Sequence, residues 1–179
     1  MNSSGSKVDV PILWIENSQS DAPVIVLCPG LAMSAAKYQK FGESLRNKGF
    51  HVAVCELRGQ GGYVPGSGRT EDHGLAEIVG IDMPAVLEAV KSRFPGSGIV
   101  LAGHSLGGCV ASLAAAVRSA SSDSLVGVVT VATSTGYYKF LGKKQALLIL
   151  CQTVAAKLVM SIYGYYPGDR RGFGGIQPK

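Results

Sequence analysis

The sequence predicts an α/β protein, a three-layer α/β/α sandwich around a mostly parallel sheet, with a helical segment added at its end. Short apolar runs without polar alternation, such as residues 23–28, are typical of parallel strands covered on both faces. These runs alternate with longer segments of helical periodicity, the order expected of a parallel sheet with crossover helices. A length of 179 residues with 46% hydrophobic and 16% charged residues suits one domain and excludes a disordered chain.

Four strands alternating with three helices are predicted, preceded by a strand-like segment at residues 8–15. The four strands are expected at residues 23–28, 51–57, 99–102 and 125–131. The first helix follows Ser34, an N-cap residue type, and places Tyr38, Phe41 and Leu45 on its inner face. The second covers residues 75–94, with an interruption near Pro84, and the third runs from residue 106 to about residue 120.

The stretch from residue 99 to residue 108 carries the chemistry that the sequence predicts. An apolar strand leads into Gly103-His104-Ser105-Leu106-Gly107, and an alanine-rich helix follows. This is the context of a nucleophile elbow, in which small neighbours allow a tight strand-to-helix turn to expose the serine hydroxyl. The start of the next helix then favours a developing oxyanion. The alternative is a glycine-rich turn with an incidental serine.

A second glycine-rich stretch, residues 59–68, does not match a phosphate-binding loop. It lacks the third glycine of the dinucleotide fingerprint, no helix starts directly after it, and the sequence has no Walker-type Gly-Lys-Ser/Thr. We expect a surface loop that borders the pocket, and no cofactor.

Cysteine usage and the first residues indicate a cytoplasmic protein. Cys28, Cys55, Cys109 and Cys151 lie on predicted strands and helices without metal-ligand spacing, so we expect reduced core thiols, no disulfide framework and no metal site. Residues 1–6 are polar and lack the apolar run of a signal peptide.

The net charge of +5 is unevenly distributed. Up to residue 136 there are ten basic and eleven acidic residues, whereas from residue 137 seven basic residues face the single acid Asp169. No reader motif accompanies this basic region, so nucleic acid is not an expected partner. A solvated face, or attraction to an anionic lipid or substrate, fits better.

The segment at residues 140–163 is strongly apolar, with Gln145, Thr153, Lys157 and Ser161 on one helical stripe. Gln152 and Lys157 interrupt it, which makes it too short and too polar to be expected to span a membrane. It is interpreted either as a helix packed on the domain or as a lid over an apolar substrate pocket, with possible peripheral membrane contact. The predicted division is a core at residues 1–136 and a helical lid and tail at 137–179.

These motifs together resemble the α/β-hydrolase superfamily. The Gly-His-Ser-Leu-Gly-Gly segment at residues 103–108 is similar to the elbow of its lipases and esterases, and Leu-Arg-Gly-Gln-Gly at 57–61 resembles a Leu-Arg-Gly-His-Gly segment. Residues 165–175 resemble the end of the lid in a group of bacterial-type hydrolases. The resemblance implies Ser105 as nucleophile, with the backbone N–H groups of Leu31 and Leu106 as oxyanion donors. Pro29 stands where many relatives have histidine.

The sequence departs from that family in its histidines. The triad order is serine, acid, histidine, yet His51, His73 and His104 all precede Ser105, and the later acids are only Asp123 and Asp169. We therefore expect an N-terminal piece of a longer serine hydrolase that acts on an apolar carboxylic ester or related acyl compound. The alternative is a catalytically incomplete scaffold that binds a lipid or a protein. An epoxide hydrolase or dehalogenase is disfavoured, because those enzymes need a carboxylate where Ser105 stands.

Overall fold

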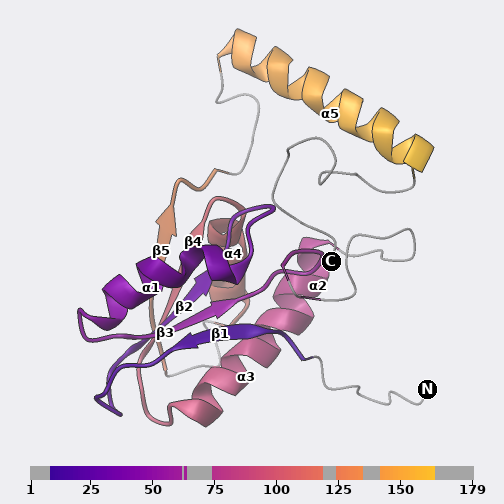
Figure 1. Ribbon diagram of the computed structural model, residues 1–179. Helices are drawn as coiled ribbons and strands as arrows, with labels where there is room; N and C mark the ends of the chain where they lie inside the picture. Colours follow the sequence, from indigo (N-terminus) through magenta and orange to yellow (C-terminus); the bar gives the residue numbers. More distant parts are fainter. Residues whose placement is uncertain (1–8, 62, 64–73, 119–123, 135–141, 164–179) are drawn as a thin grey trace, which may run out of the picture.

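The sheet of the computed structural model has five strands in the order β1-β3-β2-β4-β5 (Figure 1). The structure describes residues 9–61, 63, 74–118, 124–134 and 142–163. β1 pairs antiparallel with β3, and the pairs β3-β2, β2-β4 and β4-β5 are parallel. The sheet is therefore mostly parallel, as predicted. The strand bounds are β1 Ile12–Ile15, β2 Val24–Cys28, β3 His51–Cys55, β4 Ile99–His104 and β5 Leu125–Val131.

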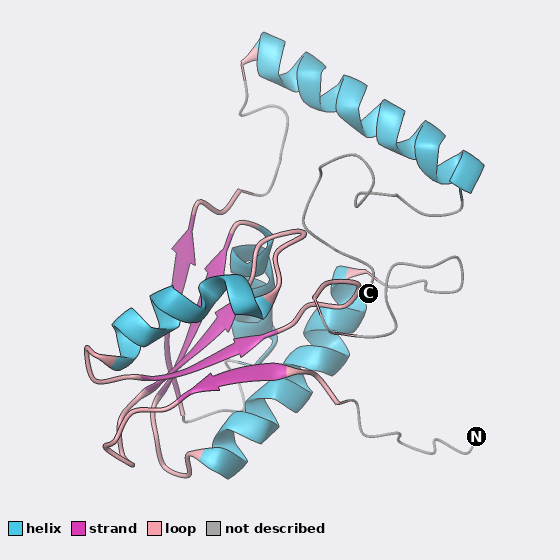
Figure 2. Cartoon of the chain, viewed as in Figure 1, coloured by secondary structure: helices cyan, strands magenta, loops and turns pink. Residues whose placement is uncertain are grey.

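Helices lie on both faces of the sheet and complete the three layers (Figure 2). One face carries the 3₁₀ helix η1 (Ala35–Tyr38) and α1 (Gln39–Arg46). The other carries α2 (Leu75–Glu77), the π-helical segment η2 (Ile78–Asp82), α3 (Met83–Arg93) and α4 (Leu106–Arg118). The interruption expected near Pro84 is this π-helical segment, which ends two residues before the proline.

The alternating direction of strand side chains explains the two apolar clusters. In β2, Val24, Val26 and Cys28 pack with α3 and α4, whereas Ile25 and Leu27 pack on the side of η1 and α1. All five are buried, which accounts for the absence of polar alternation in this strand.

Three local expectations need correction. The first strand begins at Ile12, and residues 9–11, which the sequence predicts within it, are not strand, while residue 8 lies outside the described residues. Ser34 occupies the N-cap position of η1, as expected, but its side chain makes no capping bond, and the N–H of Ala35 donates to the Glu56 carboxylate. Only Cys28 and Cys55 of the four free thiols are buried, and Cys151 is exposed. The division at residue 136 stays a prediction.

β5 and α5 (Lys143–Tyr163) leave apolar surface uncovered within the described part of the chain. β5 forms one edge of the sheet, and its residues Val126 and Val131 are 65% and 55% exposed. α5 has no buried residue and stands apart from the sheet (Figure 1). It has 21 residues and contains an 18-residue window with a mean hydropathy of 1.8, so by length and composition it could cross a membrane, contrary to the expectation drawn from Gln152 and Lys157.

Candidate functional site

Ser105 occupies a sharp turn between β4 and α4. Its φ angle is +53°, in the left-handed region that side chains other than glycine rarely adopt. The N–H of Ser105 donates to the carbonyl oxygen of Val131 at 2.9 Å, and the N–H of Gly108 donates to the carbonyl of Ser105 at 3.0 Å. Ser105 as a whole residue is half-buried. Residues 99–108 thus form the predicted strand, turn and helix.

Glycines on either side of Ser105 make this turn sterically possible. A Cβ atom at Gly103 would overlap the backbone of Gly107, and one at Gly107 would overlap the carbonyl oxygens of Cys28 and Pro29. Neither obstacle is a flexible side chain. α4 therefore starts in direct contact with the end of β2, which brings the Ser105 turn beside the segment that follows β2.

The segment after β2 forms a second tight turn. Ala32 has a φ of +60°, a conformation that costs on the order of 1 kcal/mol or more for a residue with a Cβ. The N–H of Gly30 donates to the Tyr38 hydroxyl at 2.9 Å, and the N–H of Ala32 donates to Oε1 of Gln60. Among the described residues the N–H of Leu31 has no hydrogen-bond partner, and the Leu31 side chain is 71% exposed.

Sequence reasoning missed Tyr38 and Gln60 as parts of this site. The sequence predicts Tyr38 only as an inner-face residue of a helix, and residues 59–68 as a surface loop. Gln60 is instead 6% exposed, because its amide reaches inward to Ala32. The substitution of glutamine for histidine in the segment at 57–61 is the only sequence signal that points to this position.

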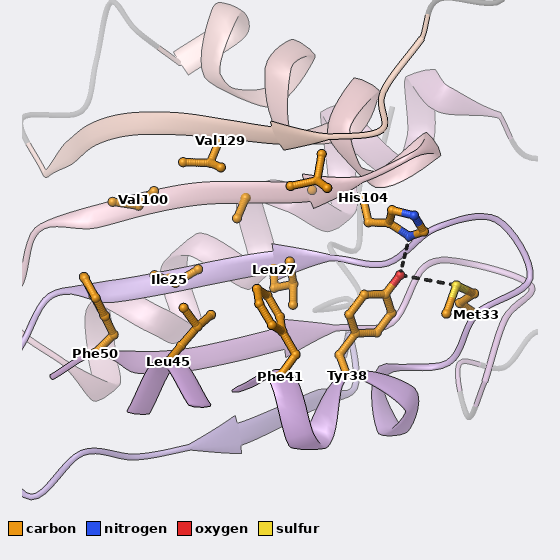
Figure 3. Close-up of a pocket in the computed structure, with 13 residues that line it drawn as sticks. Ile25, Leu27, Met33, Tyr38, Phe41, Leu45, Phe50, Val100, His104 and Val129 are labelled. Atoms are coloured by element: carbon orange, nitrogen blue, oxygen red, sulfur yellow. Dashed lines mark hydrogen bonds between the residues drawn. The ribbon is translucent and has the colours of Figure 1, made fainter. Parts of the chain in front are cut away.

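His104 is engaged on the α1 side of the sheet. Its Nδ1 atom lies 2.9 Å from the Tyr38 hydroxyl oxygen, and Figure 3 shows the two side chains directed toward each other. His51 is buried in β3, stacks on Phe94 at 4.0 Å and accepts a hydrogen bond from the N–H of Asn17, which indicates a structural role. His73 lies outside the described residues. The two described histidines, His51 and His104, contact other side chains and do not supply a base directed at Ser105.

A largely buried charge pair joins the loop after β3 to the π-helical segment. Arg58 donates to both carboxylate oxygens of Asp82, at 2.7 and 2.8 Å, and Tyr63 donates to Oδ1 of Asp82 at 3.0 Å. The hydrogen bond to Asp82 raises the pKa of Arg58. Burial, reinforced by the negative charge of Asp82, raises the pKa of Tyr63 to about 12. We assign this cluster to stability.

Neither of the acids that follow Ser105 can be placed in the site, because Asp123 and Asp169 lie outside the described residues. Within the described part of the chain, no group of three or more histidine, cysteine, aspartate or glutamate side chains could hold a metal ion.

An apolar cavity of about 490 Å³ runs along the α1 face of the sheet (Figure 3). Gly103, His104 and Tyr38 form its end nearest the Ser105 turn, and Phe50 contributes to the opposite end. Ser105 itself does not line it. The remaining walls are apolar, formed by Ile25, Leu27, Met33, Phe41, Leu45, Val100, Ala102, Val129 and Val131.

Comparison with known proteins supports the same fold. A family model described as "Serine aminopeptidase, S33" matches residues 19–164. No curated protein matches the chain. A monoacylglycerol lipase of Paleococcus ferrophilus is 23% identical, with a TM-score of 0.57, over 87% of this chain and 52% of the lipase.

Two further solved structures are similar. One comes from work on carboxylesterases of the thaumarchaeon Nitrososphaera gargenis, with 18% identity and a TM-score of 0.60 over 89% of this chain and 52% of that one. The other is Est1E from Butyrivibrio proteoclasticus with ferulic acid bound, with 22% identity and a TM-score of 0.56 over 69% of this chain and 49% of Est1E. The chain thus spans about half the length of the solved structures named here.

Proposed function

Because the chain belongs to the serine aminopeptidase S33 family of the α/β-hydrolase superfamily, we propose that it contributes the nucleophile of a serine hydrolase. Ser105 is the proposed nucleophile. The observation that carries this assignment is its left-handed conformation between β4 and α4, which places a half-buried serine directly before the start of a helix. A strained residue of this kind persists only where the surrounding structure holds it, and such residues concentrate at functional sites.

Two backbone N–H groups are the proposed oxyanion donors. Leu106 is the first residue of α4, so its N–H has no acceptor within the helix and carries the positive end of the helix dipole. Leu31 supplies the second N–H, which has no partner among the described residues. Donors of this type contribute about 3–4 kcal/mol each to transition-state stabilisation.

The proposed substrate is a carboxylic ester or related acyl compound with an apolar acyl part. An apolar cavity begins at Gly103 and His104, directly before Ser105, and the exposed Leu31 side chain adds apolar surface at the second turn. The similar structures named for lipase and carboxylesterase activities support the same class of reaction.

The proton acceptor of Ser105 is not among the described histidines, since His104 is hydrogen-bonded to Tyr38 and His51 is buried beside Phe94. Within the 179 residues, His73 is the only other histidine. A histidine outside these 179 residues is the alternative source of the base.

A fluorophosphonate probe and short p-nitrophenyl esters test the assignment. In the full-length protein we expect labelling at Ser105, located by peptide mass spectrometry, and none in Ser105→Ala. A His73→Ala variant that is labelled as fast as the wild type excludes His73 as the base. Labelling that persists in Ser105→Ala would sink the assignment.

A non-catalytic scaffold is the second candidate, favoured by the engagement of His104 with Tyr38 and by the lack of any histidine after Ser105. It predicts a folded protein without labelling or ester turnover, even with prolonged incubation.

A further inference from the structure

The turn at residues 30–35 is held from outside by three buried side chains. Tyr38, Glu56 and Gln60 are 8%, 8% and 6% exposed, and they accept hydrogen bonds from the N–H groups of Gly30, Ala35 and Ala32 in turn. Met33 is held within the turn, since its N–H donates to the carbonyl of Gly30 at 3.2 Å.

Two N–H groups of the turn have no partner among the described residues, those of Leu31 and Ser34. The Leu31 N–H is the one that lies between two held groups, because Gly30 and Ala32 are each tied to a buried side chain and the two peptide planes between them have little freedom to rotate. The left-handed conformation of Ala32 adds to the need for restraint, because an alanine released from Gln60 can relax to an ordinary backbone conformation.

We propose that Gln60 is a positioning residue for the oxyanion turn. Its amide oxygen holds the Ala32 N–H, keeps Ala32 in the left-handed region and thereby aims the Leu31 N–H at the substrate oxygen. The inference rests on the proposed function of Leu31. An uncharged acceptor suits this place, since a carboxylate could form the same bond but would put a negative charge beside a developing oxyanion.

The sheet order explains why residue 60 can do this. β3 and β2 are parallel neighbours, so their carboxyl ends meet at one edge, and the loops that follow them lie side by side there. Gly61 has a φ of +57° and no side chain, and a Cβ there would overlap the Glu56 carboxylate. Glu56 and Gln60 can therefore both turn inward from the same short loop.

Two variants of Gln60 separate the loss of the hydrogen-bond acceptor from the addition of a negative charge. Gln60→Leu removes the acceptor at similar size, whereas Gln60→Glu keeps an acceptor and adds a charge. Amide hydrogen exchange by NMR on the whole chain reports the turn directly, without any need for activity. In Gln60→Leu we expect exchange at Ala32 to accelerate about tenfold or more, with Ala35 within about threefold of wild type. In Gln60→Glu, Ala32 stays protected.

The rate of fluorophosphonate labelling at Ser105 reports the consequence. We expect both variants to be labelled about tenfold more slowly or worse, Gln60→Leu through geometry and Gln60→Glu through charge. Gln39→Leu, an exposed glutamine on α1, is the matched control and is labelled at the wild-type rate.

Unchanged Ala32 exchange in Gln60→Leu would overturn the proposal, and so would accelerated exchange with unchanged labelling. Failure of the proposed function has a different signature, namely a wild type that is not labelled or a label that survives Ser105→Ala. In that case Gln60 does not position an oxyanion donor, even if amide exchange at Ala32 is accelerated in Gln60→Leu as expected.

The apolar side chains of α5 are not covered by any described residue. They support a second inference that is independent of the first. Leu147, Leu158 and Ile162 are 61%, 60% and 71% exposed. The helix has three lysines and no acidic residue, and Lys143 and Lys144 lie in its first turn, where the positive end of the helix dipole disfavours them. The headgroups of an anionic lipid surface would neutralise the lysine charges, and its acyl chains would cover the exposed apolar side chains.

We infer that α5 binds an anionic lipid bilayer and lies along its interface. Lys157, with Gln152 nearby, occupies the middle of the helix, where a charged side chain would be costly at the centre of a bilayer, by about 2.5–3.5 kcal/mol on insertion scales. At the interface the aliphatic stem of Lys157 can extend toward water, while Leu147, Leu158 and Ile162 enter the acyl region.

Vesicle flotation of the whole chain tests this inference. Vesicles with about 30% phosphatidylglycerol should retain the protein, and pure phosphatidylcholine vesicles should retain much less. The double variant Lys143→Gln/Lys144→Gln should lower binding about tenfold or more, whereas Lys37→Gln/Lys40→Gln, on η1 and α1, should not. Equal retention by both vesicle types, or binding unchanged in the α5 variant, would overturn it.

Discussion

The hydroxyl oxygen of Tyr38 lies 2.9 Å from Nδ1 of His104, and through this contact η1 is joined to the end of β4, the strand that leads into Ser105. The same oxygen accepts the N–H of Gly30, so one phenol connects both turns of the site. We expect Tyr38→Phe to lower the free energy of unfolding by about 1–3 kcal/mol, because two polar groups lose a buried partner. Urea denaturation measures the change.

A double-mutant cycle of Tyr38→Phe with His104→Phe isolates the direct contact. A coupling of about 1 kcal/mol is expected, since the residues share a hydrogen bond. Strict additivity of the two substitutions would mean that the phenol acts through Gly30 and Met33 and not through His104.

Gly107→Ala is expected to prevent stable folding. The new Cβ would overlap the carbonyl oxygens of Cys28 and Pro29, and α4 cannot withdraw without opening its contact with β2. Circular dichroism and thermal unfolding check this. Gly80→Ala is the matched control: Gly80 is exposed in η2 and a Cβ there would meet nothing within 4 Å, so a neutral or slightly stabilising effect is expected. A Gly107→Ala protein that unfolds like the wild type would contradict the close approach.

Asp82→Asn should cost about 3 kcal/mol in the free energy of unfolding. The carboxylate is 3% exposed and accepts two bonds from Arg58, whose charge would be left largely buried without its partner. The exposed pair of Arg93 and Glu16 provides the comparison, with side chains 47% and 45% exposed, and Glu16→Gln should cost less than about 1 kcal/mol. Equal losses in the two variants would show that burial does not govern these pairs.

Tyr63 should ionise at a higher pH than an ordinary tyrosine. Its pKa of about 12 in the folded protein exceeds the ordinary value near 10, so the folded state retains a proton that the unfolded chain releases. The stabilising contribution is therefore complete below about pH 10 and is lost as the pH rises toward 12. Absorbance titration at about 295 nm should show a late component that Tyr63→Phe removes. Superimposable curves for the two proteins would refute this environment.

Much of the scaffold follows from local pattern. The apolar run at 23–28 predicts β2 to within one residue, and the strand expected at 125–131 is β5 itself. The Gly-x-Ser-x-Gly spacing predicts the Ser105 turn for a steric reason, since only glycine fits where α4 meets the end of β2. The prediction of a surface loop at residues 59–68 is wrong at Gln60, because nothing in the loop's composition indicates that this side chain turns inward to Ala32.

Local sequence by itself determined the strands, the helices and the serine-bearing turn of this protein, because strand burial, helical periodicity and glycine spacing act over a few residues. Only the tertiary structure decided which side chains hold the turn at residues 30–35. Gln60 reaches Ala32 because β3 and β2 are parallel neighbours that end at the same edge, and His104 reaches Tyr38 because η1 packs over the end of β4. Contacts between residues 28 or 66 positions apart depend on strand order, which no local pattern encodes.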